Sequence, residues 1–391
     1  MGLSWLLLVL AGFFVTFQNL RQPHRMADCP WAKTWLVVAA FALTIKAIPV
    51  WYWSDPWSER HGELRLFFGA CALYGLIGYK NLARNTLVML AHALCISSAF
   101  GLSWVLLHGR DALPSHPIPW AGGMAMISAL LLALSLKSDF SQTHRRLWFF
   151  GGLLAVMAVL ASQSRGAYGI VFWWLAVGLH HLWAHRQNLQ GPNGLRHFTP
   201  RRLTFVAVIL LCLASLSQTP VFQRPAQSLQ DAVNEIRVSS QSTAEGANSS
   251  VGARLYMWQN SLVAIKQSPW IGHGHDTRKE LLRQWAEAAH SDEIKRLGHV
   301  HNEYLHQLID HGLWGLGSQL VYLGGLLLIC WQMQQKGYKT AALSLAGMVF
   351  IHFTVSLSNV NFAHNYYTIS LSLFVGLSLW LSRLELAKPK P

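Results

Sequence analysis

The sequence predicts an all-α, polytopic integral membrane protein, and three observations support this prediction. Of the 391 residues, 52% are hydrophobic and only 12% are charged, whereas soluble domains carry roughly 25% charged residues. Apolar runs of about 17–25 residues, the length that crosses a bilayer, recur along the chain. Basic loops alternate with loops poor in lysine and arginine. The formal net charge of +14 therefore does not require a nucleic-acid partner.

Eleven membrane spans are predicted, and a twelfth is possible if a short apolar piece of the polar segment re-enters the membrane. The spans cover residues 3–18, 33–53, 64–79, 86–107, 118–136, 147–163, 167–184, 203–218, 312–331, 341–358 and 366–382. The first span has no basic segment before it, so it is predicted to be retained rather than cleaved as a signal peptide. The five cysteines lie in or beside the spans and predict no disulfide framework.

A long polar segment divides these spans into two groups. Because the most basic loops fall on alternate connections, they are predicted to be cytoplasmic. The polar segment then faces the periplasm of a bacterial inner membrane. Three regions follow: an N-terminal span bundle (1–218), the polar segment that carries the candidate site (219–311), and the C-terminal spans (312–391).

The polar segment is predicted to contain a flexible part and two helices. Residues 219–253 end in a run rich in serine, alanine, glycine and asparagine, which predicts a mobile lid or linker. Residues 254–268 form an amphipathic pattern, with Leu255, Trp258, Leu262 and Ile265 at helical spacing. Pro269 ends this helix, and Gly272 and Gly274 predict a turn. Residues 277–297 predict a second, more charged helix.

His301 is the first candidate for chemistry. His301-Asn302 is followed by nine residues and then by Gly312-Leu313-Trp314-Gly315. A helix through this stretch would place His301 about three turns from Gly312, near the lipid headgroups. The two glycines would let the span pack closely against a neighbour. An imidazole titrates near pH 6.5, so it is an available base at neutral pH. The alternative is an interfacial histidine that caps a helix.

Two arginines on the same predicted face of the membrane are candidates for phosphate binding. Arg254 begins the amphipathic helix, where a guanidinium and free backbone N–H groups together suit phosphate oxygens. Arg165 lies on a short turn between two spans, against the positive-inside bias. The alternatives are a solvated helix end for Arg254 and snorkelling to the headgroups for Arg165. Lys46 and Arg278 are possible further members of a cationic pocket.

A metal site is the weaker prediction for this segment. Several histidines, including His273, His275, His299 and His306, accompany His301, and histidine is a common metal ligand. However, the segment has no cysteine, and no outward loop has the paired carboxylates that would hold Mg²⁺ beside a diphosphate. No metal and no other cofactor are predicted.

These motifs together resemble the O-antigen ligase family, within a group that also contains O-antigen polymerases and bacterial O-linked oligosaccharyltransferases. The resemblance is carried by His301-Asn302 with Gly312 and Gly315, by Arg254 with Trp258, and by Ser164-Arg165-Gly166 before a span. Pro269-Trp270-Ile271-Gly272-His273-Gly274 adds to it. The layout is similar over nearly the whole chain, although twelve spans are usual for these ligases.

The resemblance implies a membrane glycosyltransferase that uses a lipid carrier. The implied donor is a polysaccharide on undecaprenyl diphosphate, and the implied acceptor is a sugar of lipid A–core. The hypothesis assigns a base role to His301 and stabilisation of the leaving diphosphate to Arg165 and Arg254. The predicted substrate-binding residues are Arg165, Arg254, Asn302, Gly274 and Arg278. No P-loop is present in the sequence, as expected for a reaction driven by an activated donor.

Three other functions remain open from the sequence. An O-antigen polymerase or a protein O-oligosaccharyltransferase of the same group would use the same type of donor. The short tail after the last predicted span favours the ligase over the oligosaccharyltransferase. A transporter for the lipid-linked glycan would instead need charges or broken helices near the middle of the membrane, whereas the candidate residues here gather at one face.

Overall fold

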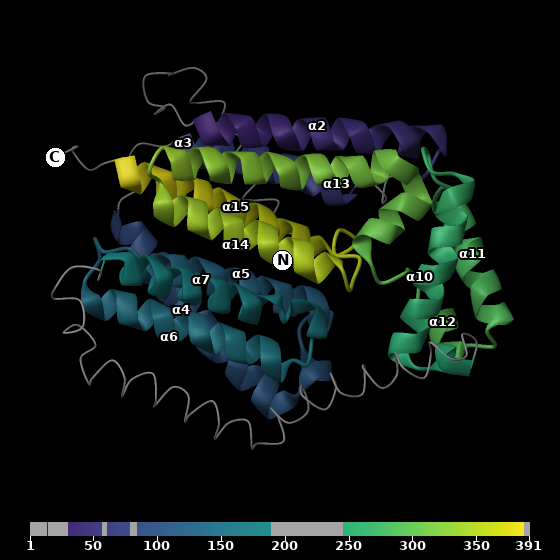
Figure 1. Ribbon diagram of the computed structural model, residues 1–391, viewed down its shortest axis with the longest axis horizontal. Coiled ribbons are helices and arrows are strands. Elements are labelled where there is room, and N and C mark those ends of the chain that lie inside the picture. Colours follow the sequence, from purple (N-terminus) through teal and green to yellow (C-terminus); the bar gives the residue numbers. More distant parts are fainter. Residues whose placement is uncertain (1–13, 15–29, 57–60, 79–83, 189–244, 387–391) are drawn as a thin grey trace.

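The structure, a computed structural model, describes residues 14, 30–56, 61–78, 84–188 and 245–386. These residues form helices joined by turns and short loops. The long helices are α2 (Pro30–Tyr52), α3 (His61–Gly78), α4 (Arg84–His108), α5 (Pro117–Ser135), α6 (Gln142–Ala161), α7 (Gly169–Asn188), α13 (Glu303–Gln335), α14 (Lys339–Ser356) and α15 (Asn365–Leu386). Figure 1 shows most of them side by side along the long axis of the molecule.

Seven of the described helices are long and apolar enough to cross a membrane, namely α2, α4, α5, α6, α13, α14 and α15. The chain is therefore a multi-pass membrane protein, and the predicted all-α fold class is confirmed. The predicted spans 64–79 and 167–184 correspond to α3 and α7, which are helical but are not among these seven. The predicted spans 3–18 and 203–218 lie outside the described residues, as does most of the predicted linker 219–253.

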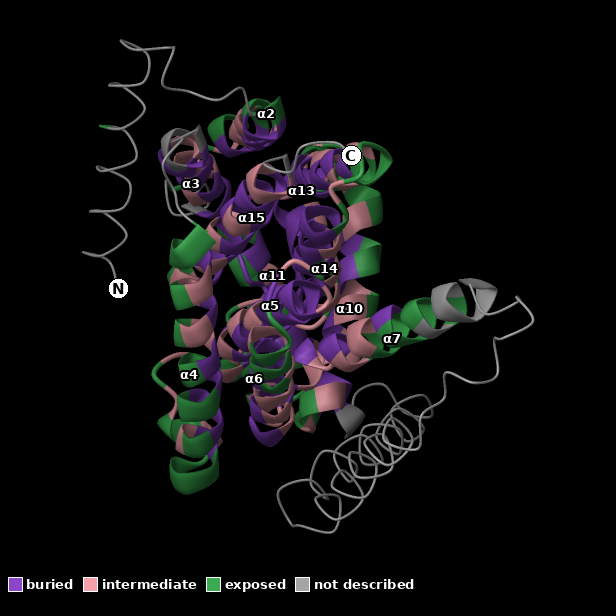
Figure 2. Ribbon diagram, turned by 90° about the vertical axis from the view of Figure 1, so that its left-hand side faces the viewer, coloured by how far each residue is buried: buried purple, intermediate pink, exposed green. Residues whose placement is uncertain are grey.

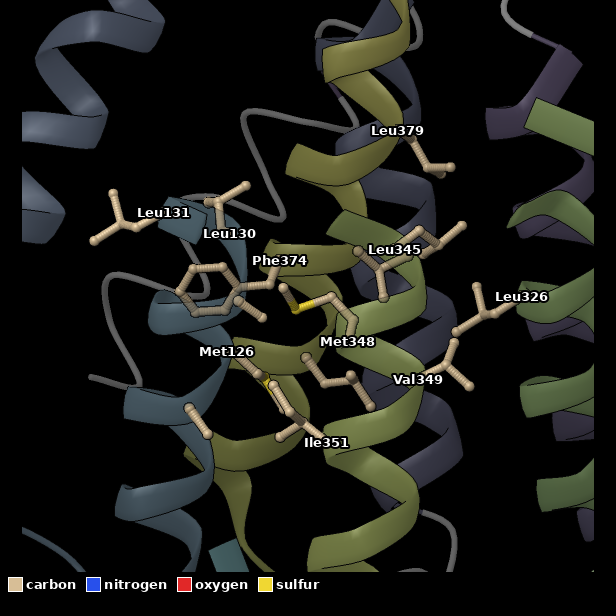
Figure 3. Close-up of a cluster of buried hydrophobic side chains, with 14 of the residues drawn as sticks. Met126, Leu130, Leu131, Leu326, Leu345, Met348, Val349, Ile351, Phe374 and Leu379 are labelled. Atoms are coloured by element: carbon tan, nitrogen blue, oxygen red, sulfur yellow. The ribbon is translucent and has the colours of Figure 1, made fainter. Parts of the chain in front are cut away.

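The core of the bundle lies around α5 and α14. The apolar stretch of α5 is 83% buried, compared with 33% in α2 and in α4, so α5 is the central helix and the other two present an outer face. Figure 2 shows the same contrast along the bundle axis. Side chains of α5, α13, α14 and α15, among them Met126, Met348 and Phe374, meet in this core (Figure 3).

A compact helical lobe gathers at one end of the bundle (Figure 1, right). It consists of the short η6 (Glu245–Asn248) and the helices α10 (Ser250–Gln267), α11 (His275–Ala288) and α12 (Asp292–Arg296). The lobe has a small apolar core of its own, to which Met257, Trp285 and Ile294 contribute. Because this core also includes Ile309 of α13, the lobe is fixed to the bundle.

The second helix predicted in the lobe, 277–297, is two helices. After α11 the backbone of His290 adopts a left-handed φ of 47°, as residues that follow a helix end often do. Ser291 then caps α12, because its hydroxyl oxygen accepts a hydrogen bond from the Ile294 amide. A left-handed residue followed by a serine cap breaks the charged pattern that the prediction treated as continuous.

The predicted amphipathic helix 254–268 is present as α10, but its buried face differs from the prediction. The buried residues of α10 are Gly252, Ala253, Met257, Ser261 and Ala264, whereas Leu262 is 53% exposed. Small residues bury this face because α10 packs close to α13 and to the other elements of the lobe. Leu262 and Val263 are exposed, whereas Leu255, Trp258 and Ile265 are partly buried.

The turn at 269–274 is joined by hydrogen bonds to a kink in α13. Gly312 has φ 58° and ψ −149°, so the helical bonding pattern is interrupted there. The carbonyls of Ile309 and Asp310 accept hydrogen bonds from the amides of His273 and Gly274, at 2.7 and 2.8 Å. In return, the Leu313 amide donates to the Pro269 carbonyl at 2.8 Å. The turn thus satisfies backbone groups that the kink leaves without a partner.

The glycines of this region have a different role from the predicted one. A Cβ on Gly312 would overlap the carbonyl group of Trp270, and a Cβ on Gly272 would overlap that of Asp310. A Cβ on Gly315 would meet the Gln307 carbonyl of the same helix. The glycines therefore allow the kink and its contact with the turn, and do not serve close packing against a neighbouring span. The prediction missed this because small residues on one face of a span are also typical of span–span contacts.

Candidate active site

His301 lies in a strained segment between the lobe and α13. Its φ is 52°, a conformation that costs a non-glycine residue of order 1–3 kcal/mol and is frequent at functional sites. Three other non-glycine residues, Ser54, Gln163 and His290, also have positive φ, but each closely follows the end of a helix. His301 instead precedes α13, where no helix end explains its conformation.

The side chain of His301 is nearly enclosed. It is 6% exposed, and its Nδ1 atom has no hydrogen-bond partner within the part of the chain that the structure describes. A buried polar atom without a partner costs about 1–3 kcal/mol, so the fold holds this imidazole at a cost. Such an atom is available to a substrate.

Two neighbours fix the position of His301. The indole of Trp258 on α10 donates to the carbonyl of Val300 at 2.8 Å. Asn302 caps α13, because its side-chain oxygen accepts from the Leu305 amide at 3.0 Å, and its amide nitrogen donates to the Leu357 carbonyl. The described side chain of Asn302 therefore has a structural role. Its predicted part in substrate binding stays a prediction.

The hydrogen bond between Trp258 and Val300 also brings Arg254 near His301. It lies one helical turn before Trp258 on α10, and residues four apart share one helix face. Burial lowers the pKa of His301 to about 2, and the nearby His299, Arg254, His116 and His364 lower it further. The ring centroids of His299 and His301 are 4.2 Å apart. The structure thus brings the predicted base and one predicted arginine together, and their charges keep the imidazole neutral.

Arg165 lies at the same end of the bundle, on the short η4 (Arg165–Ala167). A Cβ on the next residue, Gly166, would overlap the side chain of Ser358, which directly follows Leu357, the contact of Asn302. Burial raises the pKa of Tyr168 to about 12, against the opposing effect of Arg165 and Arg110. Arg165 is not among the charges that chiefly act on His301. Through the contacts of Gly166 with Ser358 and of Leu357 with Asn302, the structure places Arg165 near the start of α13.

Three residues beside this site were not predicted from the sequence. His116 precedes α5, and burial, Arg110 and Arg254 all lower its pKa. His364 precedes α15, its ring centroid is 5.3 Å from that of His116, and burial and His116 lower its pKa to about 4. The third residue, Arg110, lies in the same loop as His116, at the start of η3 (Arg110–Ala112). We call His116, His299, His301, His364, Arg110, Arg165 and Arg254 the histidine–arginine cluster.

Gly274 and Arg278, both predicted to bind substrate, hold the lobe on α13. Gly274 has φ 78° and begins α11, and a Cβ there would press on Trp53. The Nε atom of Arg278 lies 2.6 Å from Asp310 Oδ1, with both side chains buried. Arg278 also donates to the Gly298 carbonyl at 2.8 Å. These contacts are structural, and a part in substrate binding stays a prediction for both residues.

Lys46, considered for a cationic pocket, belongs instead to a buried polar network. Its ammonium group donates to Gln307 and lies 2.8 Å from His311 Nδ1. The other ring nitrogen of His311 is 2.8 Å from Asp55, which also accepts from the His275 amide. Because an ammonium is only a donor, His311 Nδ1 accepts and Nε2 carries the proton to Asp55. We call Lys46, Asp55, Arg278, Glu303, Gln307, Asp310 and His311 the α13 network.

The described residues contain no group of three or more histidine, cysteine, aspartate or glutamate side chains arranged to hold a metal ion. The histidines of the cluster pair with one another by ring contacts and with arginines by charge. The expected independence from metal stays a prediction, because only measurement of the reaction tests it.

The fold and the cluster define a multi-pass membrane protein with a buried polar site where a helical lobe meets the end of the bundle. Residues 150–320 match the family model described as O-antigen ligase. This range contains Arg165, Arg254 and His301. The match confirms the resemblance to the O-antigen ligase family that the motifs predicted.

Two curated proteins are similar to the chain. An uncharacterized protein of Haemophilus influenzae is 26% identical over 249 residues, which cover 60% of this chain and 56% of that protein. A general O-oligosaccharyltransferase of Acinetobacter baylyi is 26% identical over 259 residues, which cover 64% of this chain and 41% of that protein. The chain thus spans about half the length of the curated relatives it matches.

Proposed function

We propose that this protein is an O-antigen ligase. It would transfer a polysaccharide from undecaprenyl diphosphate to lipid A–core at the periplasmic face of the inner membrane. One observation carries the proposal: the His301 imidazole is buried on a strained backbone, its Nδ1 has no hydrogen-bond partner among the described residues, and Arg254 is near enough for its charge to lower the pKa of the imidazole. The family match supports the class of reaction.

In the proposed reaction, an acceptor hydroxyl oxygen forms a bond to the anomeric carbon of the donor. The bond from that carbon to the diphosphate breaks, and its electron pair leaves with the diphosphate. The hydroxyl proton moves to the imidazole of His301. Displacement from the opposite face predicts inversion at the anomeric carbon. The donor is already activated, so the reaction needs neither ATP nor a metal ion.

The electrostatics of the cluster support a base that becomes effective when the donor binds. Without substrate, burial and the neighbouring cations hold the pKa of His301 at about 2, so the imidazole is neutral but weakly basic. A bound diphosphate would bring negative charge beside Arg254 and His301. An opposite charge nearby favours the protonated imidazole and raises its pKa. The donor would thereby strengthen the base that its own transfer requires.

Arg254 and Arg165 are assigned to the leaving diphosphate. Developing charge on the phosphate oxygens is stabilised by guanidinium groups, which can bind two oxygens at once. Arg254 lies close enough to affect His299, His301 and His116, which supports a place beside the reacting centre. Arg165 and Arg110 both act on Tyr168, and they would extend the cationic surface along the donor.

The direct test uses purified protein in liposomes with undecaprenyl-diphosphate-linked glycan and lipid A–core. Wild-type protein is expected to produce lipid A–core of higher mass, with and without a metal chelator. His301→Ala should insert in the membrane but form no such product. If lipid A–core is unchanged while longer glycans appear on the carrier, the protein is a polymerase. If the donor crosses the bilayer uncleaved, it is a transporter.

A second candidate function is favoured by one comparison. The similar protein of Acinetobacter baylyi is named a general O-oligosaccharyltransferase, and the same cluster would serve a protein hydroxyl as acceptor. The two functions differ only in the acceptor. Replacing lipid A–core by a serine-rich acceptor protein in the same liposome assay separates them, since a ligase should leave that protein unmodified.

A further inference from the structure

The lobe and the bundle form a partly open cavity of about 150 Å³ beside His299. The start of α3, helix α11, the loop before His301, and the loop between α14 and α15 contribute its walls. One buried water occupies roughly 10–15 Å³ on this measure, so the cavity has room for about ten water-sized groups. That is about the number of non-hydrogen atoms in one hexose.

The polar walls of the cavity offer both hydrogen-bond donors and acceptors. Glu63, Arg278 and His306 line it, and these residues are 3%, 3% and 6% exposed. The charge of Arg278 is compensated by Asp310, at 2.6 Å. A site built from Glu63 and a compensated arginine does not select an anion. It suits neutral hydroxyl groups, each of which donates one hydrogen bond and accepts others.

An apolar wall completes the cavity. Phe362 lines it and is 5% exposed. Its backbone amide donates to Glu303 Oε2 at 3.0 Å, which fixes the loop that carries the ring. A sugar ring has hydroxyl groups at its rim and C–H groups on its faces. An aromatic side chain beside polar groups therefore matches its two kinds of surface.

The cavity adjoins the histidine–arginine cluster through His299. This side chain lines the cavity, and its ring centroid is 4.2 Å from that of His301. Burial lowers the pKa of His299, and the charges of Arg278 in the cavity and Arg254 in the cluster lower it further. His299 thus stands between a cavity suited to hydroxyl groups and a cationic region suited to a diphosphate.

We propose that this cavity binds one sugar ring of a glycan substrate and presents it to His301. The inference rests on the proposed transfer reaction and names a sugar site for it. Two sources supply the same chemistry: the accepting sugar of lipid A–core, and the first sugar of the donor. In either case, the ring would lie beside the imidazole that accepts the hydroxyl proton.

Two substitutions fill the cavity without disturbing the fold. Gly298 lines the cavity, and a Cβ built on it meets no atom within 4 Å. Ala363 lines the cavity and is exposed. Gly298→Leu and Ala363→Leu should therefore occupy the cavity. Gly324→Leu is the matched control, because Gly324 of α13 also has open space around its Cβ but lies away from the cavity.

The liposome assay with lipid A–core and undecaprenyl-diphosphate-linked glycan gives the readout. If the cavity holds the accepting sugar, Gly298→Leu and Ala363→Leu should raise KM for lipid A–core at least tenfold and change KM for the donor less than twofold. If it holds the first donor sugar, the pattern reverses. Gly324→Leu should change neither constant. Unchanged KM values in both cavity variants would overturn the proposal.

A binding measurement separates this inference from the proposed function. The free core oligosaccharide, released from lipid A, is titrated into wild-type protein and both cavity variants in detergent, and saturation-transfer NMR reports binding. If wild-type protein binds this oligosaccharide and the filled variants do not, the sugar site stands even where no transfer is detected. Equal binding by all three proteins, together with unchanged KM values, would refute the site and leave the transfer reaction intact.

Discussion

Two polar groups of residues lie at the same end of the bundle, and their charged side chains are paired differently. In the α13 network, cations meet acceptors directly: Arg278 lies 2.6 Å from Asp310, and His311 lies between Lys46 and Asp55. In the histidine–arginine cluster, the neighbours that lower the pKa of His301 are other histidines and Arg254. The first arrangement satisfies its charges internally, whereas the second suits an anion that comes from outside.

The difference separates structural from chemical roles within one short stretch of sequence. His301, His306 and His311 are spaced five residues apart, and all three are buried. His311 is bonded at both ring nitrogens, so it has no atom to offer a substrate. His301 has an unpartnered Nδ1 and a strained backbone. Hydrogen bonding and conformation therefore distinguish residues that the sequence presents as alike.

The largest expected effect is on activity, from His301→Ala. Loss of a general base typically lowers the rate about 10²–10⁴-fold. The substitution also removes a buried ring nitrogen that has no hydrogen-bond partner among the described residues, so the fold should not be strongly destabilised. Transfer to lipid A–core and the thermal unfolding midpoint in detergent are measured on the same preparation. His181→Ala, at an exposed site on α7, is the control and should change neither. A fully active His301→Ala protein would remove His301 from the mechanism.

The second effect is on stability, from Lys46→Met. The substitution removes the donor to Gln307 and His311. Two buried acceptors lose their partner at about 1–3 kcal/mol each, so unfolding should become easier by roughly 2–6 kcal/mol. Arg110→Met, in the cluster, should leave the unfolding midpoint nearly unchanged. If both substitutions lower the midpoint equally, the contrast between the two regions is wrong.

The third effect concerns the kink that joins both regions. Gly312→Ala places a side chain at φ 58° and ψ −149° and against the Trp270 carbonyl. The conformation alone costs of order 1–3 kcal/mol, and the overlap adds to it. Gly317→Ala, in the same helix with open space around it, should be neutral or slightly stabilising. Thermal unfolding of the two variants decides whether the kink is a structural requirement.

The sequence revealed the parts of the site that lie close together along the chain. His301 and Arg254 were predictable because a basic residue at a helix start and a histidine before a span are local signals. His116, His364 and Arg110 were not, because they lie in two loops that are distant in sequence, one between α4 and α5 and one before α15. The resemblance to a family named the motif residues but did not divide them into those that hold the fold and those that remain available.

The start of α13 shows what hydropathy alone does not reveal. The predicted span begins at residue 312, whereas α13 begins at Glu303. Glu303, Asp310 and His311 lower the apolar character of the first turns, so hydropathy assigns these turns to the polar segment and not to the span. Their partners come from other parts of the chain: Phe362 for Glu303, Arg278 for Asp310 and Asp55 for His311. Burial of polar residues by distant partners cannot be read from a local window.

The smallest expected effect is a pH dependence that differs between two kinetic constants. The dependence of kcat/KM on pH reports groups of the free enzyme, and that of kcat reports the substrate complex. In the free enzyme the pKa of His301 is lowered to about 2, so its base form is present throughout pH 5–8. Protonation of His301 should therefore cause no fall in kcat/KM on the acid side of this range. In the donor complex the diphosphate raises the pKa of His301, so kcat should begin to fall at a higher pH than kcat/KM does.

Rates measured from pH 4 to 8 with limiting and saturating donor test this difference between the two constants. If kcat/KM falls with a midpoint near 6.5 and Arg254→Met leaves that midpoint in place, the neighbouring cations do not lower the pKa of His301. The contrast between the charges of the cluster and those of the α13 network would then be wrong.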